Sequence, residues 1–208
     1  MSSRFKTVYL GLALVVAIAL VVISGLATPF DTWLLTKFDA GQTPGELTFW
    51  IAVSDLGKPL VIGTLTVLVS LIALALGNRP AFWFVATCGA VSFVAEPLLK
   101  FVVHRVRPLE LYPETLPQTW SFPSGHAMFS MTFYLSIAYV LSNYATRKLS
   151  IIVRISALMM AFMIALSRLE LGVHYFSDVF AGALLGYVIV TAVRLLQNYP
   201  AEGSHSPK

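Results

Sequence analysis

The sequence predicts an all-α, polytopic membrane protein with six transmembrane helices and short amphipathic helices at the interface. Of its 208 residues, 57% are hydrophobic and only 12% are charged, and the mean hydropathy is +0.79. A water-soluble domain of this length could not bury so much apolar surface. The apolar residues are also gathered into segments of about 20 residues, the length that an α-helix needs to cross the hydrocarbon core.

Six segments have the length and composition of membrane spans. The first three are strongly apolar, whereas the fourth carries hydroxyl groups and aromatic rings and the fifth has an arginine near each end. The first follows two basic residues, as a signal peptide would, but its long apolar core leads us to expect that it is retained as a span. The predicted spans are residues 7–26, 58–77, 81–103, 126–143, 150–168 and 175–197.

Residues 27–57, between the first two spans, are too many for a simple turn. Apolar residues recur there on one helical face, and Thr43 to Glu46 fits a capping box with proline at the first helical position. We therefore expect two short amphipathic helices at the membrane interface, with Trp33 and Trp50 as anchors. Most of these side chains need do no more than pack, although a rim that admits lipid from the side is an alternative.

The chain shows no internal repeat, low-complexity tract or domain boundary. We expect residues 1–200 to form a single integral membrane domain and residues 201–208 to be a disordered tail. The one cysteine, Cys88, excludes an intrachain disulfide. The isoelectric point is near 9.3, but in a membrane protein basic loops report topology or anionic lipid, so we expect no nucleic-acid partner. No obligate protein partner is evident.

The basic residues give a weak prediction of topology. With six spans, eight lie on the face that holds both termini: Arg4, Lys6, Arg79, Arg147, Lys148, Arg154, Arg194 and Lys208. The opposite face has six: Lys37, Lys58, Lys100, Arg105, Arg107 and Arg168. The bias predicts cytoplasmic N- and C-termini in the plasma (inner) membrane.

Three polar clusters interrupt the apolar pattern, at residues 100–108, 123–126 and 167–178. The ends of spans three and five and the starts of spans four and six must reach the same face, so an alternating path brings the clusters together. Cations are costly in a membrane, and Lys100, Arg107 and Arg168 together indicate a site for a polyanion. Ser124 and Gly125, just before a helix, offer backbone N–H groups to an anion such as phosphate.

Two histidines could supply chemistry in this cluster. His174 and Asp178 are four residues apart, so on a helix their side chains would meet on one face. A carboxylate that orients one ring nitrogen leaves the other free to attack phosphorus. His126 could then protonate the leaving oxygen as a general acid, while the cations would stabilise the equatorial phosphate oxygens.

Structural roles could explain each of these residues singly. Lys100 could be an anchor that reaches the interface, or could pair with Glu96 one turn earlier. We expect Arg105 to be solvated or to contact lipid headgroups. His126 could simply cap a helix, and His174 with Asp178 could be a structural pair. Only the three clusters in order, on one face, favour catalysis.

The motifs resemble those of the type 2 phosphatidic acid phosphatase superfamily, which includes membrane lipid phosphatases. The resemblance is carried by Lys100-x6-Arg107-Pro108, Pro123-Ser-Gly-His126 and Ser167-Arg168-x5-His174-x3-Asp178. It implies an extracytoplasmic active site that needs no metal or other cofactor. It also implies a role for each residue: His174 as nucleophile, Asp178 as its orienting group, His126 as general acid, and Lys100, Arg107, Ser124, Gly125 and Arg168 as phosphate ligands.

This resemblance predicts a lipid phosphatase that works through a phosphohistidine. Short members of the superfamily resemble undecaprenyl-diphosphate and phosphatidylglycerophosphate phosphatases. We expect a polyprenyl diphosphate as substrate, with phosphatidylglycerophosphate or phosphatidic acid as close alternatives. A phosphotransferase using the same site, or an anion transporter using the basic cluster as a path, would be consistent with the same residues.

Overall fold

The computed structural model describes residues 3–38, 43–108 and 119–199, and these form eight α-helices. In chain order they are α1 (Ser3–Ile23), α2 (Thr28–Phe38), α3 (Pro44–Asp55), α4 (Pro59–Ala75), α5 (Arg79–Val103), α6 (Gly125–Ser142), α7 (Arg147–Glu170) and α8 (Phe176–Leu196). The predicted tail, residues 201–208, lies outside the described residues.

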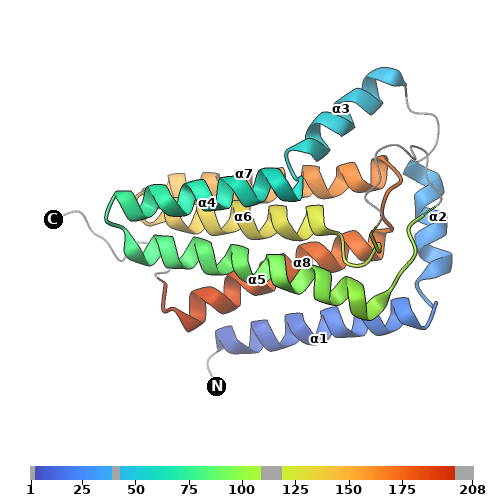
Figure 1. The fold of residues 1–208 in the computed structure, drawn as a ribbon, viewed down its shortest axis with the longest axis horizontal. Helices are drawn as coiled ribbons and strands as arrows, with labels where there is room; N and C mark the ends of the chain where they lie inside the picture. Colours follow the sequence, from blue (N-terminus) through green and yellow to red (C-terminus); the bar gives the residue numbers. More distant parts are fainter. Residues whose placement is uncertain (1–2, 39–42, 109–118, 200–208) are drawn as a thin grey trace.

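Six long helices run side by side as a bundle, and two short helices lie at one end of it (Figure 1). α1 begins and α8 ends at the opposite end, as six alternating passes require. α2 stands across the ends of the long helices, and α3 leads into α4 through a short turn. The end of α5, the start of α6 and the α7–α8 link lie at the same end as α2 and α3.

Five segments meet the length and hydropathy expected of a membrane span among the described residues: Phe5–Ile23, Pro44–Ala75, Arg79–Val103, Arg147–Glu170 and Phe176–Leu196. The prediction of six spans is therefore confirmed only in part, because α6 is not among them. α6 lies inside the bundle, packed against α4, α5, α7 and α8. Its hydroxyl groups are buried against protein, so its sequence did not have to be as apolar as that of a lipid-facing helix.

The two short helices between the first two long ones were predicted, and they are confirmed as α2 and α3. At the start of α3, the Thr43 N–H donates to Glu46 at 2.7 Å, and the Glu46 N–H donates to the Thr43 hydroxyl at 3.3 Å. This is the expected capping box, and it satisfies two donors that a helix start leaves unpaired. Trp33 on α2 is 54% exposed, as an interfacial anchor would be.

α6 and α8 approach closely because α8 presents glycines to α6. A Cβ atom at Gly182 would lie 2.5 Å from the carbonyl oxygen of Ser124, and one at Gly186 would lie 2.6 Å from that of Met128. The two glycines are four residues apart and form the small-residue stripe that lets membrane helices touch through their backbones. This contact fixes the position at which α6 begins.

We predict that Gly182→Ala lowers the melting temperature in detergent, because the new methyl group would push the start of α6 away from α8. Overpacking of this kind costs about 1–3 kcal/mol. The matched control is Gly45→Ala, because a Cβ atom there meets nothing within 4 Å. Equal melting temperatures for Gly182→Ala and the parent would contradict this account of the packing.

Candidate active site

A cavity of about 890 Å³ opens at the end of the bundle that carries α2 and α3. Its walls come from the α3–α4 turn, the end of α5, the start of α6, the end of α7 and the link to α8. Six of the eight predicted site residues line it: Lys100, Arg107, Gly125, His126, Arg168 and His174. The other two, Ser124 and Asp178, lie behind its wall and are completely buried. The expectation that the three clusters share one face is thus confirmed by geometry.

His174 lies in the link between α7 and α8, so the prediction that it shares a helix with Asp178 is wrong. α8 begins only at Phe176, and Asp178 is its third residue. The Asp178 carboxylate instead accepts the N–H of Tyr175 at 2.9 Å, which turns the chain sharply in front of the helix. His174 is held above this turn and is only 2% exposed.

The imidazole of His174 reaches Asp178 through a serine. Nδ1 of His174 lies 3.7 Å from Oδ2 of Asp178, which is too far for a hydrogen bond. The Ser121 hydroxyl donates to this carboxylate oxygen at 2.5 Å and lies 3.3 Å from Nδ1. Since a hydroxyl has one proton to donate, we infer that Nδ1 carries a proton and donates it to Ser121. Nε2 then keeps its lone pair.

Arg107 meets the other side of the ring. Its Nη1 lies 3.2 Å from Nε2 of His174 and donates to the carbonyl of Val173 at 2.9 Å. Its Nε donates to the carbonyl of Thr119 at 2.8 Å, which fixes the guanidinium plane. A phosphate group brought to Nε2 would therefore meet this guanidinium directly.

The two other predicted cations border the same cavity. Lys100 forms an ion pair with Glu96 at 2.7 Å, as its spacing allowed, and donates to the Thr119 hydroxyl at 3.2 Å. Arg168 donates to the hydroxyl of Ser54, and its Nε is buried without a hydrogen-bond partner among the described residues. A buried N–H of this kind is a costly defect unless a ligand satisfies it.

The start of α6 differs in one detail from the prediction. The N–H of Ser124 was expected to be free for an anion, but it donates to the carbonyl of Asp178 at 3.0 Å. Gly125 is the first helical residue and remains on the cavity wall, next to His126. The ring of His126 makes no hydrogen bond with another described residue, so it is available to a substrate.

Arg105 is the largest correction to the sequence analysis, which treated it as a solvated residue. It is paired on two sides, with Asp178 at 2.7 Å and with Asp31 of α2 at 2.6 Å. Its guanidinium also lies over the ring of Tyr175, 4.1 Å from the centroid. Sequence reasoning missed Asp31 and Ser121 altogether. A lone acid in an apolar helix was the available signal for Asp31, and the position of Ser121 beside the Pro-Ser-Gly-His motif was the signal for the serine.

Burial, more than the neighbouring charges, keeps the imidazole of His174 neutral. Burial lowers the pKa of His174 to about 3, and Arg107 and Arg168 add to this, while Asp178 opposes it. A neutral imidazole at physiological pH has a lone pair with which to attack. Burial also acts against the charge of Arg105, but Asp178 and Asp31 outweigh it and raise the pKa of this guanidinium.

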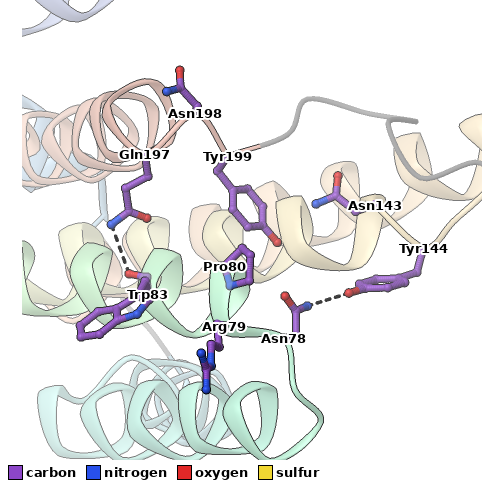
Figure 2. A pocket seen from close by; sticks show the side chains of 9 residues that line it. All are labelled: Asn78, Arg79, Pro80, Trp83, Asn143, Tyr144, Gln197, Asn198 and Tyr199. Atoms are coloured by element: carbon purple, nitrogen blue, oxygen red, sulfur yellow. Dashed lines mark hydrogen bonds between the residues drawn. The ribbon is translucent and has the colours of Figure 1, made fainter.

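A second cavity, of about 630 Å³, lies at the other end of the bundle, where the α4–α5 turn meets the ends of α6 and α8 (Figure 2). Two hydrogen bonds join residues that line it: Asn78 donates to the Tyr144 hydroxyl at 2.6 Å, and Gln197 donates to the Trp83 carbonyl at 3.4 Å. No histidine or carboxylate is among its described lining residues.

Comparison with known proteins places this geometry in a family. The model of the PAP2 superfamily matches residues 80–201, more than half of the chain and all three polar clusters. The chain belongs to the PAP2 superfamily. The predicted resemblance to this superfamily is therefore confirmed.

Two curated relatives of this PAP2 protein are phosphatases. It is 36% identical over 99 residues to phosphatidylglycerophosphatase B of Bacillus subtilis, which is 47% of this chain but only 48% of that enzyme. The chain thus spans about half the length of this relative. It is also 36% identical over 151 residues to decaprenylphosphoryl-5-phosphoribose phosphatase of Mycobacterium tuberculosis, covering 70% of this chain and 77% of that protein.

Two solved structures have the same fold as this PAP2 chain. A transmembrane PAP2-type phosphatidylglycerolphosphate phosphatase from Bacillus subtilis superposes with a TM-score of 0.81 at 23% identity, covering 95% of this chain and 97% of that one. LpxE from Aquifex aeolicus superposes with a TM-score of 0.55 at 24% identity, covering 80% and 95%. These likenesses support a multi-pass PAP2 fold in the membrane.

We predict that Ser121→Ala slows turnover of this PAP2 protein, because among the described residues it is the hydroxyl of Ser121 that links His174 to Asp178 within hydrogen-bond distance. The expected loss is on the order of 10-fold in kcat, the usual scale for a residue that orients a catalytic group. Ser130→Ala is the matched control, because the Ser130 hydroxyl is buried without a partner among the described residues. Equal activity of both variants would contradict the proposed linking role.

Proposed function

We propose that this protein removes a terminal phosphate from a membrane lipid through a phosphohistidine at His174. One observation carries the proposal: His174, whose Nε2 lies 3.2 Å from Nη1 of Arg107, lines a cavity whose wall also holds Arg107, Lys100 and Arg168. An imidazole with its other nitrogen bonded away from the cavity is prepared to attack, and the three cations are placed to bind phosphate oxygens.

The proposed reaction has two steps. In the first, Nε2 of His174 attacks phosphorus, the bond from phosphorus to the lipid oxygen breaks, and His126 gives that oxygen a proton. In the second, His126 takes a proton from a water molecule, which attacks phosphorus and breaks its bond to His174. Asp178 stays ionised, and its charge stabilises the imidazolium character of His174 in both steps. Each step uses only groups of this chain, the lipid and water.

We place phosphatidylglycerophosphate first among three candidate substrates, ahead of undecaprenyl diphosphate and phosphatidic acid. The cavity contains the carboxylates of Asp55 and Glu96 beside its cations, and Asp55 is half-exposed in an ion pair with Lys58 at 2.8 Å. Carboxylates accept hydrogen bonds from hydroxyl groups and repel a second phosphate. A glycerol between the phosphate and the lipid fits this lining better than a diphosphate. The two curated relatives are also named for phosphates on a glycerol and on a ribose.

We predict that the purified protein releases phosphate from phosphatidylglycerophosphate in detergent with EDTA present, and that His174→Asn abolishes the release. His104→Asn is the matched control, because His104 is exposed and its left-handed backbone suits asparagine. Parallel assays with undecaprenyl diphosphate and phosphatidic acid rank the three substrates. Release that survives His174→Asn would contradict the proposal, and transfer to an added lipid alcohol in place of release would make the protein a transferase.

We further propose that the cavity faces the extracytoplasmic side of the plasma membrane and that both termini are cytoplasmic. The described basic residues Arg79, Arg147, Lys148, Arg154 and Arg194 support this orientation, because they lie at or near the ends of α5, α7 and α8 that are away from the cavity.

Cysteine labelling in intact cells tests this orientation. In a Cys88→Ala background, we predict that a membrane-impermeant maleimide labels Val106→Cys but not Tyr144→Cys. Val106 is 72% exposed near the cavity, and Tyr144 is 70% exposed at the opposite end. Labelling of Tyr144→Cys but not of Val106→Cys would contradict this orientation and indicate the opposite one.

A further inference from the structure

We propose that Asp31 and Arg105 form a positioning pair that leaves one uncompensated negative charge on Asp178 for His174. The inference rests on the proposed function, because it concerns the charge that a phosphohistidine mechanism needs beside its nucleophile. Asp31 lies outside the three polar clusters, and Arg105, although it lies within residues 100–108, was not among the predicted site residues. Both act through Asp178, since neither lines the cavity.

The geometry joins three segments of the chain that are distant in sequence. Asp31, on the short helix α2, is 1% exposed, and its carboxylate accepts three hydrogen bonds. Nη2 of Arg105 donates at 2.6 Å, the hydroxyl of Ser177 donates at 2.5 Å, and the N–H of Ser177 donates at 3.0 Å. Arg105, after α5, turns its other terminal nitrogen to Asp178 at 2.7 Å and to the Ser177 hydroxyl at 2.6 Å.

The two carboxylate oxygens of Asp178 have different partners. Oδ1 accepts a hydrogen bond from the guanidinium of Arg105, whereas Oδ2 accepts one from the hydroxyl of Ser121, which contacts His174. With Oδ1 held by a planar donor, the carboxylate cannot rotate away from the imidazole. The fork of an arginine is suited to this task, because its two terminal nitrogens reach two carboxylates at once.

The balance of charge explains why the second carboxylate is needed. Arg105 next to Asp178 alone would form a neutral pair, and Asp178 would then stabilise a positive His174 only weakly. Asp31 binds the same guanidinium and restores a net charge of minus one to the group of three. Because these charges are buried, each is felt strongly by its neighbours. A protein that keeps Arg105 but lacks Asp31 should therefore have a lower kcat than a protein that lacks both residues.

A double-mutant cycle tests this inference. We expect Asp31→Asn to lower kcat by about 10- to 100-fold, the scale seen when a partner of a catalytic group is lost, with KM changed less than about twofold because the cavity is intact. Arg105→Gln should also lower kcat, since it leaves two carboxylates with no cation between them. The variant with both changes keeps Asp178 as one carboxylate held by Ser121 and the N–H of Tyr175, and we expect its kcat to exceed that of Asp31→Asn.

The cycle separates charge from structure. If the pair only holds α2 against α8, kcat would fall in step with the melting temperature, and the double variant, which loses the contacts of Arg105 to both carboxylates, would be less active than Asp31→Asn. That result, or a kcat for Asp31→Asn equal to that of the parent, would overturn the inference. Failure of the parent to hydrolyse any of the lipid substrates would instead count against the proposed function. Melting temperatures of all variants in detergent identify any that fail to fold.

Discussion

The buried carboxylate of Asp178 is the interaction on which the rest of the site depends. It accepts hydrogen bonds from Arg105, Ser121 and the N–H of Tyr175, and the backbone carbonyl of Asp178 accepts one from the N–H of Ser124. These contacts join the end of α5, the approach to α6 and the start of α8. A buried ionised group is very costly unless it is fully hydrogen-bonded. The fold therefore has to bring these segments together, and in doing so it places His174 at the cavity wall.

The position of α6 provides the other constraint. Because α6 is surrounded by protein, its first turn can be buried beside α8 through Gly182, and His126 is carried to the cavity opposite His174. A helix exposed to lipid on one side would leave the polar groups at its start without protein partners. The long helix that is not among the candidate membrane spans is thus the one packed inside the bundle, which places its hydroxyl groups where protein can satisfy them.

Much of this arrangement could be predicted from the sequence. Segment length and hydropathy located the long helices, and the alternation of passes put residues 100–108, 123–126 and 167–178 at one end. The Thr43 capping box was also readable, because its four residues interact locally. The local conformation around His174 was not, since a spacing of four residues fits a helix and a capped turn equally well. Only the fold shows that α8 begins after the histidine.

Contacts between distant segments account for the remaining errors. Asp31 and Arg105 are 74 residues apart, and no local sequence pattern predicts their contact. Arg105 looked like one more basic residue at the end of a span, because the acid that binds it lies on another helix. The cations predicted to bind phosphate were easier to find, since Lys100, Arg107 and Arg168 each belong to a motif that marks the cavity.

Direct detection of the phosphoenzyme tests the central claim that His174 is the nucleophile. The protein would be mixed with a lipid labelled with ³²P in its terminal phosphate, quenched in alkali within one turnover, and digested for mass spectrometry. The account predicts an alkali-stable, acid-labile phosphoryl group on the peptide that contains His174. A phosphoryl group on another residue, or hydrolysis without any labelled protein under conditions that preserve phosphohistidine, would contradict it.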